Sequence, residues 1–414
     1  MSARTRPSVG EDAGPASTPA PEGPIERIRV LWLIKGLGAG GAERLICLVA
    51  EATDREAFDC EVAYLLPWKD ALAPDLERIG VPVTCLHGGR EWDLRWAFRL
   101  RRLLRDHRID VVHVHSPYVA GIARLVARSF RPARRPRIVY TEHLPWPGYV
   151  LPTRWLNAFT FPLDDAHVAV SDAVRDSVWK PLATHLRTVV HGIPLDEVRQ
   201  RTEARDAARK ELGIQPDEIL IGTVGNLREQ KRYPDLLEAA RAVVDAESSI
   251  RFAAAGAGAD DPSGAAIIRR HAALGLADRF RFLGYVEDTG RFLSACDLFV
   301  LASGFEGLAV SMMEALALGL PVVATAVPGI EGEIRDGEEG LLVPVGRPDL
   351  LAAAILTLAR DPERRTRMAA AARAGADRYD IIAAVRDIET VYRHITTRRG
   401  SAEPVRHQPE RTHR

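Results

Sequence analysis

The chain has 414 residues, 46% of them hydrophobic and 27% charged, and its formal net charge is zero. This composition is typical of a soluble globular protein, and a neutral chain has no overall attraction for nucleic acid, so we expect no nucleic-acid partner. The length is too great for one small core and favours two domains.

Both ends of the chain, residues 1–24 and 399–414, are predicted to be disordered tails. The first tail is rich in Pro, Ala, Gly and Ser and has no apolar run, so it does not resemble a signal peptide. The longest apolar stretch, around 315–330, is interrupted by Gly319 and Pro321 and falls short of the roughly 20 residues that span a bilayer. The four cysteines are scattered without a Cys-x-x-Cys motif, which fits a reducing compartment. We expect a cytoplasmic protein, with peripheral contact on the inner face of a membrane as an alternative.

Strand-like and helical segments alternate along residues 25–196, which predicts a parallel sheet with crossover helices. The predicted strands are IRVLWLI, CEVAYLL, VPVTCL, DVVHVH, IVYTEH and HVAVS, and the helices begin at Ala42 or span 93–107 and 118–130.

A second unit with the same alternation covers 197–380 and opens on a charged stretch, 197–212. Its predicted strands are ILIGTVGN, IRFAAAG, FRFLGY, CDLFVLA, PVVAT and GLLVP, and its helices span 234–246, 263–274, 311–318, 349–359 and 363–376. A last helix is predicted at 381–396. We therefore expect an α/β protein of two Rossmann-like, doubly wound parallel-sheet domains that face each other across a cleft.

The first predicted strand is followed by GLGAGGAER, in which Gly36, Gly38 and Gly41 form a G-x-G-x-x-G motif. A dinucleotide-binding fold pairs this motif with an acidic residue near the end of the second strand. Here Glu61 lies at the beginning of that strand, so the motif is only half matched. The two remaining interpretations are a structural tight turn and a loop that brings a ligand close to the backbone and to a helix N-terminus.

Twelve arginines lie in residues 95–137, against only two acidic residues. This arginine cluster could contact anionic lipid or an acidic substrate, and a solvated helix face is the alternative. The aromatic segment 144–161 could form a lip for a lipid-linked acceptor or pack in the core. Together the two segments lead to the hypothesis of contact with an anionic membrane.

Three histidines end strands of the first unit: His113, His115 and His143. The first two project to the same face of their strand, so a metal pair is one interpretation, although no third ligand is evident nearby. The other is one buried, hydrogen-bonded histidine and one near the cleft. His143 should project at the C-terminal edge of the sheet, where we expect it to contact a reacting sugar.

The segment VGNLREQKR places Arg228 and Lys231 after the first strand of the second unit, where the two cations could neutralise a diphosphate. A solvated basic loop is the alternative. Glu306 and Glu314, with seven residues between them, follow the strand CDLFVLA, one in a glycine-containing loop and one in the next helix. In an open α/β sheet ligands bind at such a junction, and two spaced carboxylates suit the hydroxyls of a nucleotide sugar.

Taken in order, these segments resemble the retaining glycosyltransferases of family 4, which have the GT-B fold. The resemblance covers roughly residues 28–395 and rests on GAGGAER, DVVHVH, TEH, VSDAV, VVHGI, VGNLREQK and FEGLAVSMMEALALGLPVVAT with DGEEGLLV. The chain departs from the family at Asn226, where Arg is frequent, and at His191, where Asn is usual.

The resemblance implies that the second unit holds a nucleoside diphosphate sugar without a metal ion or other cofactor, with Arg228 and Lys231 on the diphosphate. Glu314 would bind the ribose hydroxyls. The donor hexose would be contacted by Glu306 and by the backbone of Gly307, Leu308 and Ala309.

On the first unit, Gly40 and Gly41 would lie close to the donor phosphate and the acceptor, and His143 near the reacting face of the sugar. The first unit would bind the acceptor, and the helix 381–396 would cross back to it. The implied catalytic residues are His143, Glu306, Arg228 and Lys231.

The implied reaction moves a hexosyl-type sugar from a UDP- or GDP-sugar to a hydroxyl of a glycan or lipid-linked saccharide, with retention, in polysaccharide or cell-envelope synthesis. A nucleotide-sugar 2-epimerase with the GT-B fold is the first alternative. An NAD-dependent oxidoreductase, suggested by the glycine motif, and a non-catalytic sugar-binding relative are the others.

Overall fold

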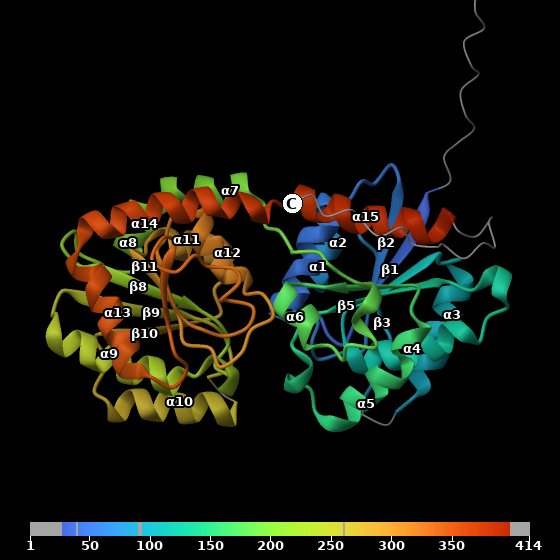
Figure 1. The fold of residues 1–414 in the computed structure, drawn as a ribbon, viewed down its shortest axis with the longest axis horizontal. Helices are drawn as coiled ribbons and strands as arrows, with labels where there is room; N and C mark the ends of the chain where they lie inside the picture. Colours follow the sequence, from blue (N-terminus) through green and yellow to red (C-terminus); the bar gives the residue numbers. More distant parts are fainter. Residues whose placement is uncertain (1–26, 39, 90–92, 260, 398–414) are drawn as a thin grey trace, which may run out of the picture.

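The computed structural model describes residues 27–38, 40–89, 93–259 and 261–397, which form two α/β domains side by side (Figure 1). Each domain has one parallel sheet with helices packed on both faces. The fold class expected from the sequence, two doubly wound parallel-sheet domains, is confirmed.

The first domain contains a seven-stranded sheet in the order β3-β2-β1-β4-β5-β6-β7. Its strands are β1 (Ile28–Ile34), β2 (Phe58–Tyr64), β3 (Val83–Cys85), β4 (Val111–Val114), β5 (Arg137–Glu142), β6 (Ala166–Ala169) and β7 (Leu186–Thr188). Its helices are α1 (Gly41–Ala52), α2 (Ala73–Arg78), α3 (Arg95–Asp106), α4 (Pro117–Arg128), α5 (Leu151–Thr160) and α6 (Asp172–Ser177).

The second domain contains a six-stranded sheet in the order β10-β9-β8-β11-β12-β13. Its strands are β8 (Ile219–Val224), β9 (Ile250–Ala255), β10 (Phe280–Gly284), β11 (Leu298–Leu301), β12 (Val322–Thr325) and β13 (Gly340–Val343). Its helices are α7 (Leu195–Gln200), α8 (Arg205–Glu211), α9 (Tyr233–Ala246), α10 (Pro262–Ala273), α11 (Thr289–Ser294), α12 (Val310–Ala317), α13 (Pro348–Arg360) and α14 (Pro362–Gly375).

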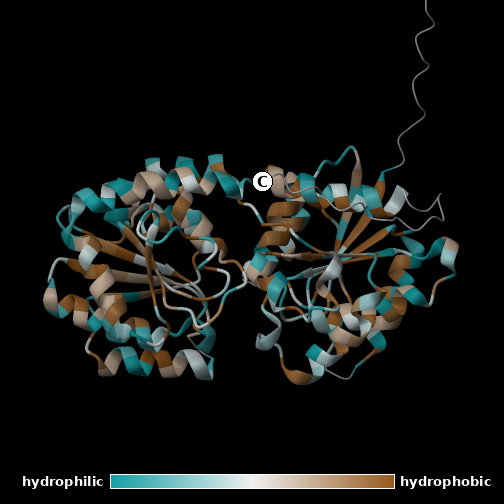
Figure 2. Cartoon of the chain, viewed as in Figure 1, coloured by the Kyte–Doolittle hydropathy of each residue, from teal (hydrophilic) through white to brown (hydrophobic). Residues whose placement is uncertain are grey.

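The central strands are short, continuous apolar runs because both of their faces are covered by helices. The last five residues of β1, VLWLI, are all buried, and so are all four of β11 and of β12. Figure 2 shows the hydrophobic colour concentrated on the strands and the hydrophilic colour on the outer faces of most helices. The sequence therefore shows these strands as unbroken apolar runs.

The chain passes between the domains twice, at neighbouring points. Ile193, after β7, forms a parallel bridge with Asp380, and the last helix, α15 (Ile381–Thr397), then returns to pack against α1 and β1 of the first domain. A buried hydrogen bond of 3.0 Å from the Trp32 indole N–H to the Tyr392 hydroxyl joins β1 to this helix.

The charged stretch 197–212 is not an extended linker, because it forms α7, a short 3-10 turn and α8. These elements pack on α11 and α12 of the second domain. Arg209 of α8 donates to the carboxylate of Asp297 and to the carbonyls of Gln215 and Glu218, so this positive charge is used to hold the start of the second sheet.

Candidate active site

Apart from His143, which follows β5, the site residues singled out by the sequence follow strands at which the strand order reverses. In the first sheet the reversal lies between β1 and β4, and in the second between β8 and β11. The loops that leave neighbouring strands at such a point diverge to opposite faces, which opens a crevice beyond the C-terminal ends of the strands. The glycine loop follows β1, and Arg228 and Glu306 follow β8 and β11.

Lys231 and Glu306 form an ion pair within the second domain. The Lys231 ammonium nitrogen lies 2.7 Å from Oε1 of Glu306, which also accepts a hydrogen bond of 2.6 Å from the Ser303 hydroxyl. Only 6% of Glu306 is exposed. The Lys231 stem passes over Gly225, where a side-chain carbon would lie 3.0 Å from it. In this structure the carboxylate is therefore already neutralised by a cation of the same crevice.

Glu314 lies one helix away, on α12, and accepts a hydrogen bond of 3.0 Å from the Thr289 hydroxyl. Burial raises the pKa of this carboxyl to about 7, against the smaller lowering effects of the Thr289 hydrogen bond and of Arg44. A carboxyl with this pKa is present in both its protonated and its ionised form near neutral pH. It is suited to accept hydrogen bonds from ligand hydroxyls once it is ionised.

Four histidines line the C-terminal edge of the first sheet, and His143 is one of them. Its Nε2 lies 3.0 Å from Nδ1 of His115, and its ring stacks on His191 with centroids 5.3 Å apart. His113, the buried member, is held between the hydroxyls of Tyr392 and Thr141 at 2.5 and 2.6 Å. Burial, together with the neighbouring imidazoles, holds the pKa of His143 well below its usual range. His143 is therefore neutral at physiological pH.

The loop that carries Glu306 packs directly against the first domain. A side-chain carbon on Gly307 would lie 1.8 Å from the His143 carbonyl oxygen, so only glycine permits this approach. The Ser171 hydroxyl donates a hydrogen bond of 2.9 Å to the Gly307 carbonyl. The loop of the second domain that carries Glu306 and the loop of the first domain that carries His143 are therefore in direct contact.

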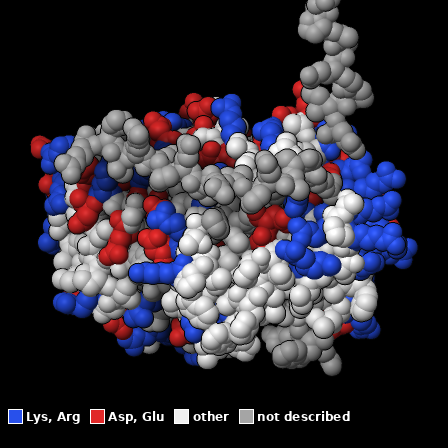
Figure 3. Space-filling model, turned by 45° about the vertical axis from the view of Figure 1, so that its right-hand side comes forward, with Lys and Arg blue, Asp and Glu red and all other residues white. Residues whose placement is uncertain are grey.

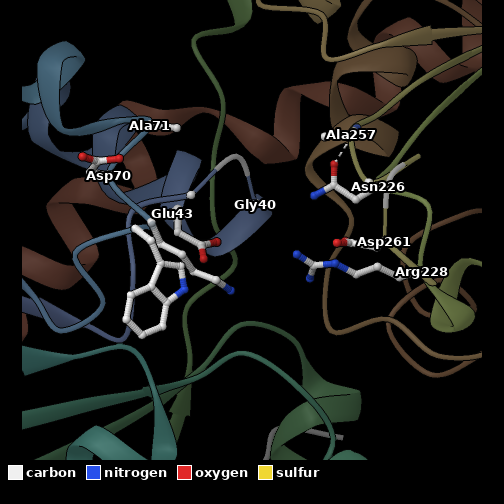
Figure 4. Close-up of a pocket in the computed structure, with 12 residues that line it drawn as sticks. Gly40, Glu43, Asp70, Ala71, Asn226, Arg228, Ala257 and Asp261 are labelled. Atoms are coloured by element: carbon white, nitrogen blue, oxygen red, sulfur yellow. Dashed lines mark hydrogen bonds between the residues drawn. The ribbon is translucent and has the colours of Figure 1, made fainter. Parts of the chain in front are cut away.

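A pocket opens between the two domains (Figure 4). Figure 4 shows Gly40 and Glu43 on one side and Arg228, Asp261 and Asn226 on the other. The lining residues from the first domain are Gly38, Gly40, Glu43, Trp68, Lys69, Asp70 and Ala71, and those from the second are Asn226, Arg228, Ala257, Gly258 and Asp261.

Glu43 is one of three charged residues on the first-domain side of the pocket, with Lys69 and Asp70. Its carboxylate folds back over Gly40, where a side-chain carbon would lie 2.2 Å from Oε2. Burial raises the pKa of Glu43, whereas the charges of Arg228 and Lys69 act in the opposite direction. Opposite it, the Asn226 amide oxygen accepts a hydrogen bond of 3.0 Å from the Ala257 N–H, so Asn226 ties together the two loops after β8 and β9.

The predicted site residues divide into two groups. Gly40 and Arg228 line the interdomain pocket, whereas Lys231, Glu306, Glu314, Gly41, His143 and the segment 307–309 do not. The sequence interpretation missed Trp68, Lys69 and Asp70. They lie in the loop that leaves the C-terminal end of β2, and this place after a strand was a signal that could have found them.

Within the described ranges, no group of three or more His, Cys, Asp or Glu side chains is arranged to hold a metal ion. The strand pair His113 and His115 therefore has no third ligand among these residues. The same part of the chain has no helix that is both long and apolar enough to cross a bilayer.

Two family models match the chain, one on each domain. Residues 39–197 match "Glycosyltransferase Family 4", and residues 204–375 match "Glycosyl transferases group 1". The putative glycosyltransferase EpsD of Bacillus subtilis is 26% identical over 71% of this chain and 79% of its own length. The phosphatidyl-myo-inositol mannosyltransferase of Mycobacterium leprae is 29% identical over 72% of this chain and 77% of its own length.

Solved structures show the same fold. HepE of Anabaena, in complex with UDP and glucose, superposes with a TM-score of 0.78 at 20% identity, covering 89% of this chain and all of the other. A sucrose-phosphate synthase from Thermosynechococcus elongatus superposes with a TM-score of 0.77 at 20% identity, over 89% of this chain and 99% of its own. The structural neighbours show the GT-B fold, and with one family model on each domain the chain is a glycosyltransferase that belongs to family 4.

Proposed function

We propose that this glycosyltransferase moves a hexosyl-type sugar from a nucleoside diphosphate sugar to an acceptor hydroxyl with retention of configuration. One observation carries the proposal. Arg228 and Lys231 both follow β8 at the reversal point of the second sheet, next to the loop and helix that present Glu306 and Glu314. Two cations beside two carboxylates match a diphosphate flanked by a ribose and a hexose.

Arg228 is exposed in the pocket and is free to approach a diphosphate from the cleft. Lys231 reaches the diphosphate by exchanging its bond to Glu306 for a bond to phosphate, which releases the carboxylate for a hexose hydroxyl. Negative charge grows on the leaving phosphate as the glycosidic bond breaks, and fixed cations stabilise that charge. No metal ion or other cofactor is required in this scheme.

In the proposed path, the acceptor hydroxyl attacks on the same face of the sugar from which the phosphate departs. The new bond forms between the acceptor oxygen and the anomeric carbon, the bond from that carbon to the phosphate oxygen breaks, and the acceptor proton passes to the leaving phosphate. Neutral His143 contacts the sugar near this face, and Gly40 and Gly41 allow the donor phosphate and the acceptor close to the backbone. Glu306 and Glu314 bind hydroxyls and do not act as the two carboxylates of a glycosidase.

We further propose that the acceptor is a glycan or lipid-linked saccharide of polysaccharide or cell-envelope synthesis, and that the donor is a UDP- or GDP-sugar. Two observations of relatives support this. An Escherichia coli relative, 22% identical over 78% of this chain and 85% of its own length, is named as a galactosyltransferase that acts from UDP-Gal on a diphosphoundecaprenol-linked sugar. The Anabaena structures hold UDP, UDP-glucose, or UDP with glucose. A cytoplasmic enzyme that touches the inner face of a membrane would meet both substrates.

The proposal is tested by measuring UDP and GDP binding by calorimetry, with and without EDTA, for the wild type, Arg228→Ala, Lys231→Ala and the exposed control Lys210→Ala. Each charge-assisted hydrogen bond to a phosphate contributes about 1.5–3 kcal/mol, so each site variant should bind about 10- to 100-fold more weakly. The control and EDTA should leave binding unchanged. Unaltered binding by both site variants would refute the diphosphate assignment, and an isomerised nucleotide sugar formed without acceptor would favour the 2-epimerase.

A further inference from the structure

Large apolar side chains are exposed together on the outer helices of the first domain. On α5, Leu151, Trp155 and Phe159 are spaced by four residues and share one face of the helix, with 58%, 46% and 76% of their surface exposed. Leu125 on α4 and Phe98 on α3 are 52% and 76% exposed. Helix α4 packs against both α3 and α5, and we name the exposed outer side of these three adjacent helices the α3–α5 face.

The helices that form the α3–α5 face are held in place by well-packed inner sides. Arg124, fully buried on α4, pairs with Asp164 at 2.6 Å and donates to the Asn157 side chain on the inner side of α5 at 2.8 Å. The Leu156 side chain fits against Gly121, where a side-chain carbon would lie 2.5 Å away. The apolar outer side of α5 is therefore held outward by a well-packed inner side.

Arginines are exposed on two of the same helices and on the segment that follows α4. Of the twelve arginines in residues 95–137, nine are exposed: Arg95, Arg99, Arg101, Arg102, Arg105, Arg108, Arg128, Arg131 and Arg134. Figure 3 shows basic side chains gathered at the end of the first domain, beside a broad area with few charged side chains. Arg101 donates to the Ser129 hydroxyl at the end of α4, which fixes the position of α3 next to α4.

We propose that the α3–α5 face docks on an anionic lipid bilayer, with Trp155, Phe159 and Phe98 in the interfacial layer and the arginines on lipid headgroups. Aromatic side chains favour the boundary between headgroups and acyl chains, and clustered arginines are attracted to anionic headgroups. A second copy of this chain would fit poorly, because a two-fold contact would bring the two arginine groups together. This inference rests on the proposed function only for the lipid-linked acceptor, since docking would hold the enzyme at the bilayer that carries such an acceptor.

The first test is vesicle flotation of the full chain with phosphatidylcholine alone and with added phosphatidylglycerol, at low and high salt. We expect the protein to float with the anionic vesicles at low salt, and high salt or neutral vesicles should release it. A protein that stays unbound with anionic vesicles at low salt would overturn the proposal. Equal binding to neutral vesicles would overturn the role of the arginines.

Two surface variants and two matched controls locate the contact. Trp155→Ser with Phe159→Ser should abolish flotation, and Arg102→Gln with Arg105→Gln should weaken it roughly 20-fold, because each basic residue near an anionic surface contributes about a fivefold factor. The controls Ile382→Ser and Arg367→Gln change an exposed apolar and an exposed basic residue on other surfaces and should float like the wild type. Flotation by the serine variant at the wild-type level would place the contact elsewhere.

The outcome is separable from that of the proposed function, because UDP and GDP binding in solution does not involve the bilayer. All four variants should bind nucleotide as the wild type does. Light scattering of the wild type and the serine variant tests whether a second copy of this chain binds the α3–α5 face instead. A wild-type dimer that becomes a monomer in the variant, without flotation of either, would show that the face binds a second copy and would contradict membrane docking.

Discussion

At the scale of single residues, Glu306 and Lys231 have a double role that sequence spacing does not show. They are 75 residues apart and meet because β8 and β11 are neighbours in the sheet. The pair is closed in this structure, with 2.7 Å between charged atoms. On binding of a donor, the ion pair of Lys231 with Glu306 would be replaced by one of Lys231 with the donor phosphate. Substitutions of the two residues should therefore affect nucleotide binding and transfer differently.

We predict that Glu306→Gln separates nucleotide binding from transfer. Without the carboxylate, Lys231 is no longer held back, so UDP or GDP should bind at least as tightly as to the wild type, whereas kcat/KM for transfer should fall by about 100-fold. Calorimetry and a coupled transfer assay measure the two quantities. Nucleotide binding as weak as in Lys231→Ala would contradict the exchange and would mean that Glu306 is needed to position Lys231.

At the scale of elements, the ends of adjacent strands determine the site, and this part was predictable. Apolar runs located every strand of both sheets except β7 (Leu186–Thr188), which is three residues long, and Arg228, Lys231, Glu306 and His143 were singled out because each follows a strand. Trp68 to Asp70 also lie in a loop after a strand, but no local pattern marks them, because their place in the pocket depends on their packing beside the glycine loop after β1. The stacking of His143 on His191 joins the ends of strands β5 and β7, and it requires knowledge of strand order that no local pattern supplies.

The histidine edge predicts a loss of stability in acid. Burial lowers the pKa of His191 to about 4 and holds the pKa values of His113, His115 and His143 well below their usual range. The unfolded chain then binds protons that the folded chain does not, so stability is intact above about pH 6.5 and is lost as the pH falls toward 4.

We predict that His191→Asn removes part of this acid sensitivity. Between pH 7.5 and pH 5, the variant should lose about 2 kcal/mol less unfolding free energy than the wild type, because one of the four suppressed protonations is absent. Urea unfolding at both pH values measures the difference. His87→Asn, a matched change at an exposed histidine of the same domain, should behave like the wild type. Equal pH dependence in His191→Asn and the wild type would show that His191 is protonated in the folded protein.

At the scale of the whole molecule, the two domains were expected to face each other across a cleft, and both face it with the C-terminal ends of their strands. How closely they touch could not be predicted. The contact at Gly307 depends on the backbone of His143 in the other domain. The hydrophobic periodicity of each segment predicts strands and helices, but it does not predict how the surfaces of two domains fit together. The exposed face of α5 is a similar case, since the aromatics of residues 144–161 divide between buried Trp146 and exposed Phe159.

The contact at Gly307 leads to the last prediction. Gly307→Ala adds a methyl group that would lie 1.8 Å from the His143 carbonyl oxygen, so the domains must separate or the loop must move. Because Lys231 and Arg228 belong to the second domain alone, nucleotide binding should remain within about threefold of the wild type, while transfer, which needs both domains, should fall by about 100-fold. Small-angle scattering should show a more open molecule. Gly332→Ala, whose added carbon would meet nothing within 4 Å, is the matched control and should match the wild type in all three measurements. Full transfer activity in Gly307→Ala would mean that catalysis does not need this close contact and that the reacting geometry is set deeper in the cleft.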